Sequence, residues 1–156
     1  METNDPARAR MRRAAYLLMG AVWTAVMLAQ ICRVQPNLSA NDRSRWCTVW
    51  SLVERGTFQI DEIDAVAGWS TIDKVRHEGH FYSSKPALYP TIVAGVYWGL
   101  KTVTGWDLLE ETALVVRTIL LIVNLLPMLL VLLLVAKIAE RHGHSDFGRL
   151  SLFLAA

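Results

Sequence analysis

Three uncharged, mostly apolar stretches alternate with charged blocks along the chain. Residues 14–32 and 118–136 each contain 19 residues without a charged side chain. At about 1.5 Å per residue, a helix of that length covers roughly 28 Å, close to the ~30 Å hydrocarbon core of a bilayer. The pattern predicts an all-α membrane protein with transmembrane helices at 14–32, 87–104 and 118–136, and at 150–156 the start of a fourth apolar segment.

The segment 87–104 is the shortest of the predicted spans. Its uncharged run ends at Lys101, so a crossing requires this side chain to extend to the lipid headgroups. A re-entrant or interfacial segment is the alternative. Residues 101–117, which include a short predicted loop at 105–117, hold two basic and three acidic side chains, whereas the loop at 137–149 holds three basic and two acidic ones. This bias favours a cytoplasmic 137–149, but the first helix dominates orientation, and we expect 87–104 to cross.

The orientation follows from the N-terminus. Residues 1–13 contain four arginines, and positive charge before a first span places that end in the cytoplasm. Residues 33–86 then form an extracytoplasmic loop. A cleaved signal peptide starts in the same way, but the apolar run is longer than a usual signal core, and residues 30–36 lack a small-x-small cleavage pattern. We therefore expect a retained span.

One amphipathic helix is predicted within the extracytoplasmic loop. Ser39 or Asn41 can cap its start, and Gly56 can end it. Its apolar face suits the bilayer interface, so we expect a juxtamembrane helix; a face buried in a small subdomain is the alternative. The apolar residues recur at the i, i+3, i+4, i+7 spacing, at Trp46, Val49, Trp50 and Val53.

A small β-hairpin is predicted further along the same loop. Residues 74–83 form an extended stretch around Glu78 and Gly79, which suit a turn. His77 and His80 flank this turn, but they lack the two-residue gap of the helical zinc-protease motif. We interpret them as part of a polar hairpin tip, and no metal site is predicted.

Composition excludes several classes of protein. The chain is 53% apolar and 19% charged, with a mean hydropathy of +0.30, which is too apolar for a typical soluble enzyme of this size. The formal net charge of +2 offers no large basic surface, so no nucleic acid partner is expected. Cys32 and Cys47 match neither a zinc framework nor a disulfide scaffold, and no cofactor is predicted.

Candidate chemistry lies in two clusters, at residues 41–46 and 81–88. In the first, Asp42 stands beside Arg43 and Arg45. A carboxylate next to guanidinium groups can accept a proton from a hydroxyl while the cations hold a phosphate. Ordinary interfacial charge is the alternative, because lysine and arginine are common where a chain meets headgroups.

The order of these features resembles the N-terminal part of GT-C fold membrane glycosyltransferases, the group that contains protein O-mannosyltransferases and the lipid A aminoarabinose transferase. Their Asp-Glu-x-Arg-Tyr type motif corresponds here to residues 42–46, and their Tyr-x-Glu-Lys-Pro-Pro-Leu type motif to residues 82–88. By this resemblance, Asp42 matches the catalytic carboxylate. Arg45 and Lys85 match the residues that meet the phosphate of the lipid donor.

The resemblance covers residues 10–137 and has three departures. Arg43 replaces the glutamate of the first motif, while Ser84 and Ala87 replace an acidic residue and a proline of the second. Family members have many more spans, so the chain corresponds to about the first quarter of one. We therefore expect a fragment that is inactive alone, with membrane lipid and further transmembrane segments of a longer protein or a partner subunit as its neighbours.

The resemblance implies the activity. The complete enzyme would transfer a sugar from a polyprenyl-phosphate donor to a hydroxyl acceptor on the extracytoplasmic side of a membrane, and the expected location is the bacterial inner membrane. A non-catalytic small membrane protein, either a remnant or an accessory subunit, is the alternative. A transporter element is less favoured, because the uncharged spans contain no ionisable residue for a transport pathway.

Overall fold

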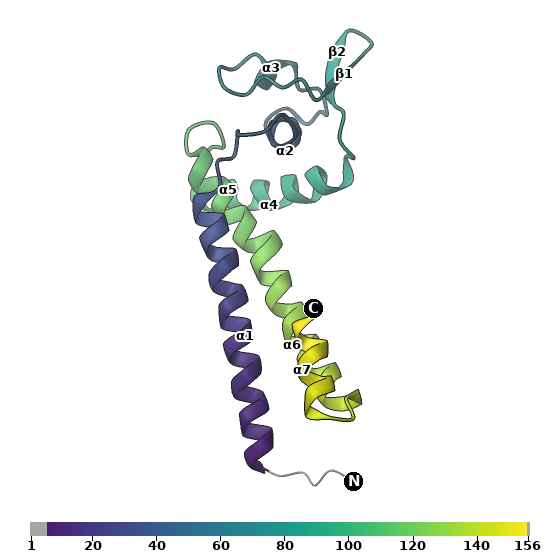
Figure 1. The fold of residues 1–156 in the computed structure, drawn as a ribbon. Coiled ribbons are helices and arrows are strands. Elements are labelled where there is room, and N and C mark those ends of the chain that lie inside the picture. Colours follow the sequence, from purple (N-terminus) through teal and green to yellow (C-terminus); the bar gives the residue numbers. More distant parts are fainter. Residues whose placement is uncertain (1–5, 156) are drawn as a thin grey trace. The chain divides into compact units, whose positions relative to one another are not determined.

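The structure, a computed structural model, describes residues 6–155 and is mostly helical (Figure 1). It contains two compact units. The first, called here the helix-pair unit, combines the chain up to Arg33 with the chain from Leu120 onward. The second, called the loop unit, is Val34–Ile119. Each unit is described by itself.

The helix-pair unit is built on α1 (Pro6–Arg33), which contacts η1 (Leu121–Leu125), α6 (Leu126–His142) and α7 (Asp146–Leu154). The ring of Tyr16 on α1 packs against that of Phe153 on α7, with 4.8 Å between centroids. Leu132 of α6 completes this small apolar cluster. The unit is therefore held together by contacts between segments at opposite ends of the sequence.

An ion cluster around the buried side chain of Arg12 fixes the direction of α1 relative to α6. Arg12 donates from Nε and Nη2 to the two carboxylate oxygens of Glu140, each at 3.0 Å, and from Nη1 to Asp146 Oδ1 at 2.6 Å. The Tyr16 hydroxyl donates to Glu140 Oε1 at 3.1 Å. Because residues near the start of α1 meet residues near the end of α6, the two helices run antiparallel (Figure 1).

Two helices are long and apolar enough to cross a membrane, judged by length and composition. The first is α1, with 28 residues; the second is the 31-residue helix Thr112–His142, formed by α5 (Thr112–Leu120), η1 and α6. Only 11% and 17% of their most apolar stretches are buried in the structure. Most of their apolar side chains therefore have no protein cover among the described residues.

The second long helix begins at Thr112, so residues 112–117, predicted as loop, are helical. Pro127 lies inside this helix, and a proline has no N–H for the carbonyl four residues earlier and clashes with it. The backbone instead forms a π-helical turn, in which Leu126 N–H donates to the Leu121 carbonyl. The wider turn accommodates Pro127 without ending the helix.

The loop unit is organised around α2 (Ala40–Arg55), which contacts α3 (Asp61–Asp64), the strand β2 (His80–Ser83) and α4 (Leu88–Thr104). Figure 1 shows α2 end-on, between α4 and the hairpin. The ends of α2 follow from local sequence. Ser39 accepts a hydrogen bond from Asp42 N–H, and Gly56 ends the helix with a φ of 66°.

The apolar face of α2 is covered by protein. Val49 and Trp50 are 1% and 5% exposed, and Trp46 and Val53 are half-buried. The expectation that this face lies at the bilayer interface is therefore corrected, because α4 and the segments after α2 pack around the helix. The face is buried in a small subdomain.

The hairpin occupies the predicted residues. The strand β1 (Lys74–His77) pairs antiparallel with β2, and His77 faces His80 across the turn. Glu78 and Gly79 have φ values of 49° and 89°, the pair of positive φ angles that a two-residue hairpin turn of type I′ requires. The hairpin is therefore set by its turn.

The helix α4 covers residues 88–104 of the predicted middle span, but it is not one of the two helices long and apolar enough to cross a membrane. Lys101 does not extend away from the unit. Its Nζ donates to Glu54 Oε1 at 2.6 Å and to Asp107 Oδ2 at 2.9 Å. Partial burial alone would lower the lysine pKa, but these two carboxylates raise it above its ordinary value.

Candidate functional site

The two candidate motifs meet through a pair of serines. Ser44 of the first motif and Ser83 of the second have their Oγ atoms 2.6 Å apart, within hydrogen-bonding distance. The Ser44 hydroxyl also donates to the main-chain carbonyl of Asp73 at 2.6 Å, and Ser44 is fully buried. Because serine is small, β2 can approach α2 closely at this point. Segments about 40 residues apart in sequence are thus brought into direct contact.

Lys85 lies just after this contact. Its Nζ is 3.2 Å from Asp73 Oδ2, and its main-chain N–H donates to Ser83 Oγ at 3.2 Å. The side chain is partly exposed, so the ion pair with Asp73 is open to exchange with another anion. Lys85 therefore offers a cation at the junction of the two motifs.

Asp42 lies in the first turn of α2, where it takes part in the helix cap. Its carboxylate Oδ2 accepts a hydrogen bond from the Ser39 hydroxyl at 2.6 Å, and its N–H donates to Ser39 Oγ at 3.1 Å. No cation pairs with this carboxylate among the residues that the structure describes. Asp42 is therefore a carboxylate without a cationic partner in the described chain, and it contributes to the helix cap through Ser39.

Arg45 and Arg43 differ in their surroundings. The half-buried Arg45 side chain makes no hydrogen bond or ion pair with any residue between 6 and 155. Arg43 instead donates from Nη1 to the main-chain carbonyl of Asn37 at 2.9 Å. Of the predicted site residues, Asp42, Arg45 and Lys85, none forms a hydrogen bond or ion pair with another within the described chain. The structure joins their segments but not their side chains.

A small pocket of about 200 Å³ lies at the junction of the two motifs. Thr48 contributes from α2, and Lys85 is the charged residue in its lining. The remaining lining residues come from the segment after α2 and from the second motif: Phe58, Tyr82, Ser83 and Ala87. The pocket therefore combines one cation with hydroxyl groups and aromatic rings, which suits part of a polar ligand with an anionic group.

The serine contact is not among the features predicted from sequence, although the sequence contains a signal for it. Ser44, Thr48 and Ser51 recur at the i, i+4, i+7 spacing, and all three are buried. A stripe of small uncharged polar side chains on one helix face marks a surface that another backbone can approach. The apolar stripe at Trp46, Val49, Trp50 and Val53 does not account for this second face of α2.

Cys47 and His80 each make a contact within the loop unit. Cys47 is fully buried, its Sγ lies 3.5 Å from the Trp69 carbonyl, and burial raises the pKa of its thiol to about 12. A thiol of that pKa is a poor nucleophile at neutral pH. His80 Nδ1 lies 3.3 Å from Asp61 Oδ2 at the hairpin. Among residues 6–155, no group of three or more potential ligands is placed to hold a metal ion.

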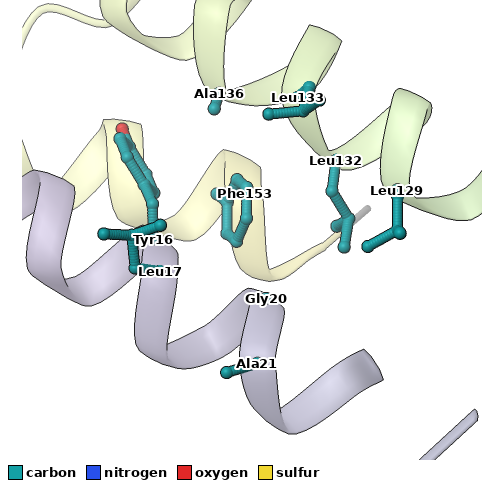
Figure 2. Close-up of a pocket in the computed structure, with 9 residues that line it drawn as sticks. All are labelled: Tyr16, Leu17, Gly20, Ala21, Leu129, Leu132, Leu133, Ala136 and Phe153. Atoms are coloured by element: carbon teal, nitrogen blue, oxygen red, sulfur yellow. The ribbon is translucent and has the colours of Figure 1, made fainter. Parts of the chain in front are cut away.

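The helix-pair unit contains a separate apolar pocket of about 310 Å³ (Figure 2). Figure 2 shows Phe153 between Tyr16 and Leu132, with Gly20 and Ala21 along α1. Gly20 has no side chain and Ala21 has only a methyl group, so this space stays open. Tyr16 carries the one hydroxyl in the lining, and it is already bonded to Glu140. The pocket can accommodate hydrocarbon, but its lining offers no acid, base or nucleophile for catalysis.

Comparison with known proteins identifies no relative of this chain. The chain matches no protein-family profile, no curated protein and no solved structure. The candidate site therefore rests on the residues and contacts described above.

Proposed function

We propose that this chain is the N-terminal part of a membrane glycosyltransferase that moves a sugar from a polyprenyl-phosphate donor to a hydroxyl acceptor. The observation that carries the proposal is the contact between Ser44 and Ser83, which joins the two motifs whose order resembles GT-C enzymes. Two motifs that contribute to one site must lie together in space. The pocket at their junction contains Lys85.

The proposed roles follow from charge and hydrogen bonding. Asp42 is the general base for the acceptor hydroxyl, because its carboxylate has no cationic partner among the described residues. Arg45 and Lys85 bind the donor phosphate and stabilise it as it leaves. Arg45 is free of other side-chain partners in the described chain, and Lys85 can exchange Asp73 for a phosphate.

A non-catalytic membrane protein is the second candidate function, and one observation favours it. Asp42 closes the α2 cap with Ser39, so a structural role already accounts for an acidic residue at this position. The two candidates differ in whether the motif junction binds a lipid phosphate.

A photo-crosslinking experiment tests the donor site. A polyprenyl-phosphate probe with a diazirine group is expected to label the chain in vesicles, and Arg45→Ala or Lys85→Ala should reduce the labelling about 10-fold or more, because each removes a charge-assisted contact. Crosslinked peptides are quantified by mass spectrometry.

Arg76→Ala is the matched control, because Arg76 is exposed on β1 outside the motifs. Unchanged labelling after both site substitutions, or an equal loss with Arg76→Ala, would contradict the donor site and favour the non-catalytic candidate.

We propose two membrane spans, α1 and the helix Thr112–His142, rather than three. With one crossing by α4 between them, the two long helices would cross the bilayer in the same direction. The Arg12 contacts with Glu140 and Asp146 instead support an antiparallel pair. In this arrangement the N-terminus and residues 137–149 share the cytoplasmic side, in agreement with their positive charge, and the loop unit is extracytoplasmic. The proposed location is the bacterial inner membrane.

In this arrangement α4 lies along the bilayer surface. One side of the helix is buried in the loop unit, at Pro90, Val93 and Tyr97. The other side exposes apolar and aromatic residues, and Lys101, the one charged residue of α4, is paired with Glu54. An uncharged outer face with tryptophan suits the interface between water and lipid.

Cysteine labelling in intact cells tests the number of spans. In a background of Cys32→Ser and Cys47→Ala, an impermeant maleimide is expected to label Ile72→Cys and Glu110→Cys but not His142→Cys. All three positions are exposed in the structure. Three spans predict the opposite at the last two positions, with Glu110→Cys protected and His142→Cys labelled. Labelling of all three after lysis is the control for reactivity.

A further inference from the structure

Four buried polar side-chain atoms in the loop unit have no hydrogen-bond partner among the described residues: Asn37 Oδ1, Arg43 Nε, Ser51 Oγ and Arg117 Nε. Buried polar atoms in folded proteins are almost always paired, because an unpaired one loses its bonds to water without replacement. Arg43 donates from Nη1 to the Asn37 carbonyl, so these two residues are in direct contact. The unpaired atoms indicate that a partner is missing.

Two of these residues line one pocket. Asn37 contributes from the segment that follows α1, and Arg117 contributes from α5. The pocket has a volume of about 430 Å³, and its lining contains no acidic residue. The other lining residues are Val34, Gln35, Pro36, Leu38 and Ala113. The pocket thus presents a guanidinium and an amide against an otherwise uncharged wall.

The positive charge of this region is not neutralised by the residues that the structure describes. Neither Arg43 nor Arg117 forms an ion pair with any carboxylate in the described part of the chain. Arg43 donates to the main-chain carbonyl of Asn37, so it adds a second positive charge next to a residue of the pocket. An anion in the pocket would balance this positive charge and accept a hydrogen bond from Arg117 Nε.

We propose that this pocket binds the phosphate ester of a lipid, with Arg117 as the direct ligand and Arg43 as a positioning residue. A guanidinium presents two parallel N–H groups, one of them Nε, to two phosphate oxygens. The Asn37 amide can donate its NH₂ to the phosphate or accept from a neighbouring hydroxyl. Both an anionic glycerophospholipid and a polyprenyl phosphate provide this chemistry.

Chain continuity places the pocket near lipid phosphates. Val34 directly follows α1, and α5 is the first part of the second long apolar helix. In the proposed two-span arrangement, both segments meet the extracytoplasmic headgroup layer. The inference rests on that membrane placement and not on sugar transfer.

Arginine modification tests the site directly. In a maltoside detergent, which has no phosphate, phenylglyoxal modification of Arg117 is followed by peptide mass spectrometry. Phosphatidylglycerol or polyprenyl phosphate is expected to slow the modification about 10-fold, the effect of one charge-assisted contact. Oleate, an anionic amphiphile without phosphate, should leave the rate unchanged. Exposed Arg76 is the internal control and should react at one rate throughout.

The arms identify the source of the phosphate. Protection by either lipid supports the site, and the lipid that protects Arg117 more strongly is identified as its ligand. Protection by inorganic phosphate alone, equal protection by oleate, or no protection in any arm would overturn the proposal. None of these results depends on Arg45 or Lys85, so failure here is distinguishable from failure of the donor site.

Variants separate binding from folding. Arg117→Gln should lower retention of the protecting lipid in native mass spectrometry about 10-fold, and Arg117→Lys should lower it less, because the charge remains but the fork is lost. Arg43→Gln should weaken the protection of Arg117 by the lipid, although Arg43 itself does not contact the ligand. Buried Cys47 reports folding, since its thiol stays unreactive while the loop unit is intact. Full retention in folded Arg117→Gln would contradict the proposal.

Discussion

Replacing Asp42 with asparagine is expected to lower the turnover of the complete enzyme by about 10²–10⁴-fold, the usual contribution of a general base. The substitution removes the basic carboxylate, but the amide oxygen can still accept the Ser39 hydroxyl, so the α2 cap remains. Donor affinity should change little. Sugar transfer from a lipid-phosphate donor is measured in membranes at saturating donor.

Ser39→Ala is the matched control for Asp42. It removes the capping hydroxyl, at a cost of about 1 kcal/mol in helix stability, and leaves the carboxylate in place. Turnover should then stay close to that of the unmodified enzyme. If Ser39→Ala lowered turnover as much as Asp42→Asn, or if Asp42→Asn were silent, Asp42 would act through the helix cap alone.

Replacing Tyr97 with alanine is expected to destabilise the loop unit by about 3–5 kcal/mol, the range for a buried aromatic residue. Tyr97 is fully buried on α4. Its hydroxyl donates to Glu54 Oε1 at 2.9 Å and accepts from Leu108 N–H at 2.9 Å. The substitution leaves a cavity and removes both bonds. Pulse proteolysis of the chain in detergent and urea measures the change in unfolding free energy.

Two further variants separate the contributions of the buried Tyr97 ring and its hydroxyl group to stability. Tyr97→Phe keeps the ring but leaves the buried Leu108 N–H unpaired, so we expect a loss of about 1–3 kcal/mol. Trp98→Ala removes a larger side chain from the adjacent position, but Trp98 is 63% exposed, and its substitution should change stability by less than about 0.5 kcal/mol. Equal losses for Tyr97→Ala and Trp98→Ala would show that α4 does not pack as described.

Arg43 illustrates how a contact changes the interpretation of a motif. From sequence, Arg43 is a departure from the GT-C pattern in which a cation replaces an acidic residue. In the structure it holds the Asn37 carbonyl. Nothing in the residues around position 43 indicates this partner, because the bond depends on how residues 34–38 turn before α2.

The sequence by itself determines the elements whose signals are local. The lengths of the apolar runs predict α1 and the helix that contains residues 118–136. Ser39 and Gly56 bound α2, and Glu78 with Gly79 set the hairpin turn. Each of these features depends on backbone bonds or φ angles within a few residues, so neighbouring residue types are sufficient to predict it.

Only the tertiary structure decides which surfaces meet. The stripe of α2 shows that one face is apolar, but α4 determines that protein rather than lipid covers it. Arg12 pairs with Glu140 across 128 residues, and that pairing makes α1 and α6 antiparallel. Ser44 meets Ser83 across 39 residues and joins the two motifs. Periodicity identifies a face and its polarity, whereas the partner of a face depends on the folded path of the whole chain.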